Sequence, residues 1–414
     1  MKKSKAILVC SICFFILCSG PLGSVASADA GKVKGVVTEF NDLDLTEPLA
    51  EVSGNISDSD LMKLDAKSVV LLEKTTGRVL CEKNSHAKLP PASITKIMSL
   101  LLVMEAIDEE RLSLDTVIQA SEHACSMGGS QIWLEPNEKM TVDELLRASV
   151  IGSANDATVA LGEKISGSEE SFVALMNQRA RSLNMNDTHF VNASGLDAEG
   201  HLSSAYDVAV MSAQLLKYGL IRKYSTVWMD SLRNGKTELV NTNKLVRFYE
   251  GATGLKTGTT DSAGCCVAAS AERDGMELIA VVMGAPTSSE RFNFARKLLD
   301  YGFANYSTVS VEVPERELSP ISVKHGTLQF VDIASEGGKS ILIESSRMDK
   351  IALEISLDKA LVAPIEKQQQ VGFCRVLLDG KELSKIKILA VHAVEKMTFP
   401  HAFKKLLSEI LNFS

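Results

Sequence analysis

An apolar segment runs from Ile94 to Ile107, directly after the Pro90-Pro91 break, with hydrophobic residues on nearly every face of a helix. A surface helix keeps one polar face, so a helix that is apolar all round must lie in the centre of a domain. Other elements must therefore surround this segment. With 414 residues, the chain is long enough to form that domain and a second one.

Strand-like segments precede and follow a group of helical segments along the chain. The strands are expected at 68–72, 78–81, 265–271 and 278–283, and the helices at 142–150, 154–165, 169–182, 204–218 and 291–301. Turn sequences lie at Thr75-Thr76-Gly77 and at Arg273-Asp274-Gly275. This order predicts an α+β domain over 60–305, with helices packed on one antiparallel sheet whose strands come from both of its ends.

The pattern changes after residue 305 to short alternating apolar runs. They lie at 309–313, 341–343, 351–355 and 386–390, and the last is preceded by the tight-turn dipeptide Asp379-Gly380. Alternation of apolar and polar residues is typical of strands that have one buried face. We therefore expect a small all-β domain over 306–395.

The C-terminal segment, 396–414, has the pattern of an amphipathic helix. Its apolar residues follow the spacing i, i+3, i+4, i+7 and i+8: Phe403, Leu406, Leu407, Ile410 and Leu411. Such a helix suits a membrane surface, although it could also dock on the body of the protein. Its place after a complete β domain favours the membrane surface.

The N-terminal residues 1–30 are expected to be a signal peptide. Lys2, Lys3 and Lys5 precede an apolar run over 6–18, and small-x-small cleavage patterns follow at 26–28 and 28–30. The run is short for an uncleaved membrane anchor, which is the alternative. We therefore predict an exported protein at the outer face of the cytoplasmic membrane or in the cell wall, with a flexible acidic leader over 31–59.

Composition argues against several other classes of protein. The formal net charge of −8 leaves no basic footprint for nucleic acid. Five cysteines remain after residue 30, an odd number without C-x-x-C spacing, and the histidines show no metal-binding pattern. We expect no disulfide framework, no metal and no cofactor, and we place Cys265 and Cys266 in the core.

Four Ser-x-x-Lys sequences occur, at Ser85, Ser93, Ser356 and Ser384. Residues i and i+3 share one face of a helix, where a neutral lysine can accept the proton of a serine hydroxyl. Only Ser93 lies at the start of the buried helix, and burial there lowers the pKa of Lys96. The alternative is that Ser93 only caps the helix.

Two further motifs follow along the chain. Of three Ser-x-Asn sequences, only Ser153-Ala154-Asn155 lies between two apolar helices, where a hydroxyl and an amide could be held in a short loop. Lys256-Thr257-Gly258 precedes an apolar strand. On an edge strand it would offer a carboxylate one ammonium and one hydroxyl, whereas the alternative is a surface turn.

In their order and spacing these motifs resemble those of the penicillin-recognising serine acyltransferases. The chain is most similar to the low-molecular-mass penicillin-binding proteins, the D-alanyl-D-alanine carboxypeptidases of serine peptidase family S11. The resemblance covers about residues 60–305, and the β domain and terminal helix match the family's usual architecture. Ala154 departs from the commoner Ser-Gly-Asn, but a small residue is retained.

The resemblance implies a catalytic group and a substrate-binding group. Ser93 would attack the carbonyl between two D-alanines, Lys96 would be the general base, Ser153 would relay a proton, and Asn155 would hold Lys96 and the substrate amide. Substrate binding would involve Lys256, Thr257, Gly258, Thr259 and Arg291, with the backbone N–H groups of Ser93 and Thr259 as the oxyanion hole. Arg291 could instead be a charge on a surface helix.

The implied substrates are peptidoglycan stem peptides, and the implied covalent inhibitors are β-lactams. One alternative is a serine β-lactamase, whose Glu-x-x-x-Asn pattern is not matched by Glu199 and Ser203. The other is a peptidoglycan-binding protein without catalysis, against which the intact motifs argue.

Overall fold

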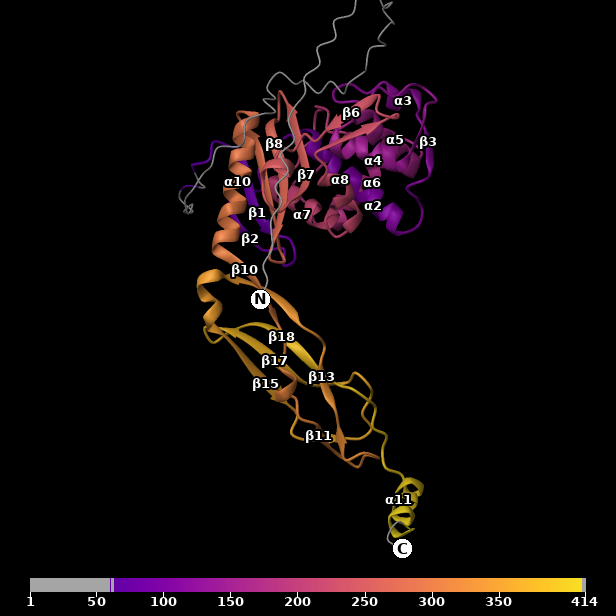
Figure 1. Ribbon diagram of the computed structural model, residues 1–414, viewed down its shortest axis with the longest axis vertical. Coiled ribbons are helices and arrows are strands. Elements are labelled where there is room, and N and C mark those ends of the chain that lie inside the picture. Colours follow the sequence, from indigo (N-terminus) through magenta and orange to yellow (C-terminus); the bar gives the residue numbers. More distant parts are fainter. Residues whose placement is uncertain (1–59, 61–62, 412–414) are drawn as a thin grey trace, which may run out of the picture. The chain divides into compact units, whose positions relative to one another are not determined.

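The computed structural model describes residue 60 and residues 63–411 (Figure 1). The first domain is built on a sheet of order β2-β1-β9-β8-β7 in which every neighbouring pair is antiparallel. Strands β1 (Ser68–Glu73) and β2 (Val79–Lys83) precede the helices, whereas β7 (Ala252–Thr260), β8 (Gly264–Arg273) and β9 (Met276–Ala285) follow them. The predicted α+β fold is confirmed, and β7 with its Lys-Thr-Gly motif is an edge strand.

Both faces of this sheet are buried. Alternate side chains of β1 belong to two different cores, Val70 to one and Val69 and Leu71 to the other. Helix α10 (Ser288–Asn305) packs on one face, and α7 (Ala205–Leu215) packs on the opposite face (Figure 1). The hydrophobic runs of the inner strands follow from this two-sided burial.

The predicted central helix is α2 (Lys96–Asp108), in which every residue from Lys96 to Met104 is buried. We expected a helix from Ile94, but residues Ala92–Thr95 form a 3₁₀ turn, η1, at whose start Ala92 has a φ of 49°. The residues at the N-cap positions are Pro91 for η1 and Thr95 for α2. The interpretation of Ser93 as a helix cap is therefore wrong.

The remaining elements of this domain are helices and two small two-stranded sheets. The helices are α3 (Glu122–Cys125), α4 (Val142–Ile151), α5 (Asn155–Ser166), α6 (Glu169–Ser182), η2 (Gly219–Ile221), α8 (Arg222–Ser225) and α9 (Leu245–Phe248). The small sheets pair β3 (Val117–Gln119) with β4 (Lys139–Thr141), across a connection that contains α3, and β5 (Met229–Leu232) with β6 (Thr237–Val240) in a hairpin. The prediction missed these short strands and the four-residue helices, because such elements are too short to show a period. It located α4, α5 and α6 within one residue.

The second domain has a hydrophobic core of its own. Its strands are β10 (Tyr306–Val311), β11 (Ile321–Lys324), β12 (Phe330–Val331), β13 (Ile333–Ser335), β14 (Lys339–Glu344), β15 (Ile351–Leu357), β16 (Leu361–Val362), β17 (Gln370–Leu378) and β18 (Lys381–Ala390), with short 3₁₀ turns η3 (Glu315–Glu317) and η4 (Ser345–Lys350). Asp379 and Gly380 join β17 to β18, both with positive φ, 49° and 76°. The tight turn predicted there is confirmed.

Helix α11 (Phe399–Leu411) is the last element described. Its apolar side chains Phe399, Phe403, Leu406 and Leu407 are all exposed. Within residues 63–411, no helix combines the length and apolar character needed to cross a membrane. The predicted signal peptide and acidic leader lie outside the described residues.

Candidate active site

The Ser93 hydroxyl lies in η1, the turn that leads into α2, beside the amine of Lys96. The Lys96 Nζ atom is 2.9 Å from Ser93 Oγ, 2.5 Å from Asn155 Oδ1 and 2.7 Å from the Ser194 carbonyl oxygen. Lys96 is completely buried. The predicted nucleophile–base pair is therefore assembled together with Asn155 and one backbone carbonyl.

The pKa of Lys96 lies well below its usual value. Burial is the main cause, the charge of Lys256 adds to it, and the Asp156 carboxylate opposes it. A neutral amine has two N–H groups and one lone pair. In the neutral form, the oxygens of Asn155 and Ser194, which can only accept hydrogen bonds, would take these two N–H groups and leave the lone pair for Ser93 Oγ.

A hydrogen-bonded histidine anchors the turn that carries Ser93. His201 Nδ1 lies 2.9 Å from the Val191 backbone nitrogen, which can only donate, so its Nε2–H group donates to Thr95 Oγ1 at 2.8 Å. Burial lowers the pKa of His201 to about 4. The neutral imidazole therefore fixes one side of η1 at neutral pH.

Ser153 lies in the short connection between α4 and α5, as predicted, and Asn155 is the first residue of α5. Ser153 has a φ of 60° and is buried. The Asn155 amide donates to the Gly128 carbonyl at 2.7 Å, which turns its oxygen toward Lys96. Among the described residues, Ser153 makes no hydrogen bond to Ser93, Lys96 or Asn155, so the backbone of this loop places its hydroxyl.

Strand β7 lies directly against the Ser93 turn at Gly258. A Cβ atom added to Gly258 would lie 2.7 Å from the Ser93 backbone nitrogen and 2.9 Å from Ala92 Cβ. No side chain fits into so close a contact without movement of the backbone. The glycine of the Lys-Thr-Gly motif is thus needed for the two elements to meet.

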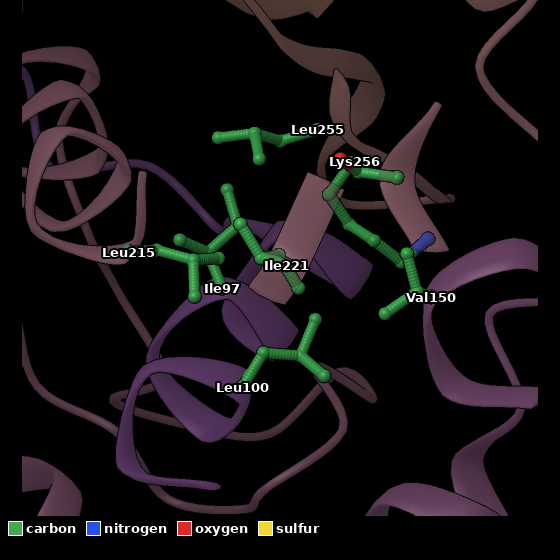
Figure 2. Close-up of a pocket in the computed structure, with 8 residues that line it drawn as sticks. Ile97, Leu100, Val150, Leu215, Ile221, Leu255 and Lys256 are labelled. Atoms are coloured by element: carbon green, nitrogen blue, oxygen red, sulfur yellow. The ribbon is translucent and has the colours of Figure 1, made fainter. Parts of the chain in front are cut away.

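Two buried cations, Lys256 on β7 and Arg291 on α10, lie next to this contact. Figure 2 shows Lys256 among the apolar side chains that line a narrow gap behind it, such as Ile97 and Val150. Burial, with the Arg291 charge, lowers the pKa of Lys256 to about 7. Arg291 Nη1 donates to Thr259 Oγ1 at 2.8 Å and to the Gly258 carbonyl at 3.1 Å.

Neither cation forms an ion pair with a carboxylate within the part of the chain that the structure describes. Lys256 is 1% exposed and Arg291 is 7% exposed. The interpretation of Arg291 as a surface charge is therefore wrong. Two buried cations that influence each other electrostatically and have no acidic partner in this part of the chain suit an anionic ligand, because buried charges are otherwise paired.

Two groups of the site could not be recognised from the sequence. The Ser194 carbonyl has no residue-type signature, although Gly195 beside it has a φ of 90° and no space for a side chain against Ala92. Thr242, whose Oγ1 lies 2.8 Å from Thr257 Oγ1, comes from a loop distant in sequence. The polar triplet Asn241-Thr242-Asn243 was the available signal.

A Ser-x-x-Lys pair at the entry to a buried central helix, with a Ser-x-Asn motif and a Lys-Thr-Gly edge strand beside it, is the arrangement of penicillin-recognising serine acyltransferases. Residues 55–287 match the peptidase S11 family, described as D-alanyl-D-alanine carboxypeptidase. Residues 306–396 match the C-terminal domain of penicillin-binding protein 5. The chain belongs to the peptidase S11 family of D-alanyl-D-alanine carboxypeptidases.

Individual relatives agree with this assignment. The chain is 43% identical to D-alanyl-D-alanine carboxypeptidase DacF of Bacillus subtilis over 353 residues, 84% of this chain and 91% of the relative. Penicillin-binding protein 5 of Haemophilus influenzae superposes with a TM-score of 0.70 at 30% identity, over 81% of this chain and 98% of that protein. Ampicillin-bound penicillin-binding protein D2 of Listeria monocytogenes has a TM-score of 0.54 at 32% identity, over 58% of this chain and 99% of that protein.

Proposed function

We propose that this protein is a serine-type D-Ala-D-Ala carboxypeptidase that removes the terminal D-alanine from peptidoglycan stem peptides and is acylated by β-lactams. One observation carries the proposal: the Ser93 hydroxyl, 2.9 Å from the Lys96 amine, adjoins two buried cations that have no acidic partner among the described residues. A terminal carboxylate bound by the cations would bring the preceding peptide bond to Ser93. Both D-alanyl-D-alanine peptides and penicillins carry such a carboxylate.

In acylation, Ser93 Oγ forms a bond to the carbonyl carbon while its proton passes to the neutral Lys96 amine. The backbone N–H groups of Ser93 and Thr259 would stabilise the negative oxygen, and a donor of this kind is typically worth about 3 kcal/mol. Asn155 would hold the Lys96 amine and the substrate amide. Thr257, Lys256 and Arg291 act on the carboxylate.

The tetrahedral intermediate collapses by cleavage of its C–N bond. The leaving D-alanine nitrogen takes one proton, which passes from the Lys96 ammonium through the Ser153 hydroxyl. Lys96 is then neutral again and can accept a proton from the water that attacks the acyl-enzyme. That step breaks the ester bond and returns a proton to Ser93 Oγ, which closes the cycle.

Release of D-alanine from a peptide ending in L-Lys-D-Ala-D-Ala tests the proposal directly. The protein without residues 1–30 should release D-alanine, and penicillin should stop the release by acylating Ser93. Ser93→Ala should abolish both reactions.

Two other results would overturn the carboxypeptidase assignment. Turnover of penicillin without D-alanine release would indicate a β-lactamase. Absence of both reactions with peptides and with cross-linked wall fragments would indicate a binding protein.

The pH dependence of kcat/KM should be bell-shaped. Deprotonation of Lys96 activates the base and produces the acidic limb. Lys256 must be protonated to attract the carboxylate, so kcat/KM should fall as pH rises through its pKa of about 7. Because the two lysines interact, the limbs report the pair, and an alkaline limb near the usual pKa of lysine would contradict the proposed role of Lys256.

We also infer that the chain divides at the proposed boundaries and acts outside the cell. In this organisation 1–30 is removed as a signal peptide, 31–59 is a leader, 60–305 is catalytic, 306–395 is the β domain, and 396–414 holds the protein on the membrane surface. The family matches over 55–287 and 306–396 support the two central divisions. The exposed apolar residues of α11 support the last.

Removal of residues 396–414 should release the protein from vesicles and leave D-alanine release unchanged within about twofold, because α11 contributes no residue to the site. Co-sedimentation with anionic vesicles measures the first effect.

The double variant Phe399→Ser, Phe403→Ser in the full chain should also release the protein from vesicles, since both rings are exposed, 82% and 54%. Phe330→Ser is the matched control because Phe330 is an equally exposed ring in the β domain, 57%. Undiminished sedimentation of the truncated chain would exclude this helix as the membrane contact.

A further inference from the structure

The loop after β6, Asn241-Thr242-Asn243, is held rigidly by its two asparagines. The Asn241 amide donates to the Val227 carbonyl at 2.8 Å, and the Asn243 amide donates to the Gly254 carbonyl at 2.9 Å. Both asparagines are buried, and their side-chain oxygens accept the backbone N–H groups of Asn243 and of Leu245, the first residue of α9. This bonding fixes the position of Thr242, the residue between them.

Thr242 connects two of the motifs of the site. Its backbone N–H donates to the carbonyl of Ile151, the last residue of α4, at 3.3 Å. Its Oγ1 lies 2.8 Å from Thr257 Oγ1 and 3.5 Å from Lys256 Nζ. Thr242 is therefore a fixed hydroxyl between the Ser153 loop and the Lys-Thr-Gly strand.

The direction of these hydrogen bonds leaves one proton unused. Thr257 donates to Thr242 Oγ1, and the Lys256 ammonium donates to the same oxygen. Within residues 63–411, the Thr242 hydroxyl proton has no acceptor. Thr257 therefore donates its only hydroxyl proton to Thr242 as long as the site holds no anion.

A bound carboxylate requires that proton. It can only accept hydrogen bonds, so Thr257 must turn its O–H group toward the carboxylate. Its oxygen then needs a donor, and Thr242 can supply one with its unused proton across the same 2.8 Å separation. The hydrogen bond between the two hydroxyls is therefore present with and without the carboxylate, but its donor changes from Thr257 to Thr242.

We propose that Thr242 is a positioning residue for recognition of the substrate's free carboxylate, acting through Thr257 and Lys256. This inference rests on the proposed carboxypeptidase function. This role predicts specificity for a carboxylate over a neutral chain end. A carboxamide can itself donate a hydrogen bond to Thr257, so the bond between Thr257 and Thr242 need not change direction when it binds. The residue itself does not react with the substrate.

The test compares Thr242→Val with Thr242→Ser. The valine variant removes the hydroxyl at nearly constant volume, and the serine variant keeps it. For L-Lys-D-Ala-D-Ala, Thr242→Val should raise KM about tenfold, the usual effect of a lost hydrogen bond to a charged group, while kcat changes less than twofold. The preference for the free peptide over its C-terminal amide should fall by the same factor, and Thr242→Ser should retain both values.

Thr253→Val is the matched control for a merely structural effect. Thr253 also lies on β7, and its hydroxyl bonds Ser270 at 2.7 Å and Glu277 at 2.8 Å, in contacts that do not include Lys256 or Thr257. Its loss should lower the melting temperature without changing the carboxylate preference. An unchanged preference in Thr242→Val, or an equal loss in Thr242→Ser, would overturn the role of Thr242. Failure of the wild-type protein to release D-alanine would instead overturn the function on which the role rests.

Discussion

Replacing Lys96 with alanine is expected to slow acylation of Ser93 by penicillin by about 10³-fold or more, with the fold retained. Loss of a positioned general base typically costs between about 10² and 10⁴ in rate. Here the loss falls in the upper part of that range, because Lys96 Nζ is the only basic group within hydrogen-bonding distance of Ser93 Oγ in the described chain. The rate of covalent labelling by a fluorescent penicillin measures the effect.

The chain contains a matched control for this substitution. Ser85 and Lys88 repeat the Ser-x-x-Lys spacing, but Ser85 Oγ bonds Glu82 and the Lys88 side chain is 55% exposed. Lys88→Ala should therefore label at the wild-type rate. Labelling of Lys96→Ala at that rate would refute the assignment of the base, whereas loss of its near-ultraviolet circular dichroism would mean that the variant had not folded.

Sequence periodicity was sufficient to predict the elements that form the body of the catalytic domain. The segment after Pro91 is apolar all round because it is covered on every side, and β8 and β9 have continuous apolar runs because both faces of the sheet are buried. Such patterns are local properties of each segment. The spacing of Ser93, Lys96 and Asn155 could not give distances, but it selected residues that the fold does bring together.

What the sequence could not predict depends on tertiary contacts and on the backbone. The Ser194 carbonyl has no side-chain signature, and Thr242 reaches the site from a loop whose place is fixed by α4 and β7. Arg291 was ambiguous because arginines are mostly exposed. Its burial depends on acceptors from β7, the Gly258 carbonyl and the Thr259 hydroxyl, which no local pattern could indicate.

Gly258→Ala is expected to slow acylation about 10²-fold, although it adds only one methyl group. The new Cβ would lie 2.7 Å from the Ser93 nitrogen and 3.1 Å from the Ile94 nitrogen. These are backbone atoms, so relief of the clash must move either η1 or β7. A displacement of about 1 Å between reacting groups can cost about 10²-fold in rate.

The Gly258→Ala variant separates the effect of misplaced catalytic groups from the effect of a missing one. Lys96, Lys256 and Ser93 all remain in Gly258→Ala, so the loss should appear in the acylation rate with penicillin and with peptide alike, together with a lower melting temperature. Gly219→Ala is the matched control, since nothing lies within 4 Å of the added Cβ there. If Gly258→Ala labelled at the rate of Gly219→Ala, the Lys-Thr-Gly strand would not lie against the nucleophile turn in solution. A selective loss with peptide alone would mean that the strand binds the substrate without fixing the position of Ser93.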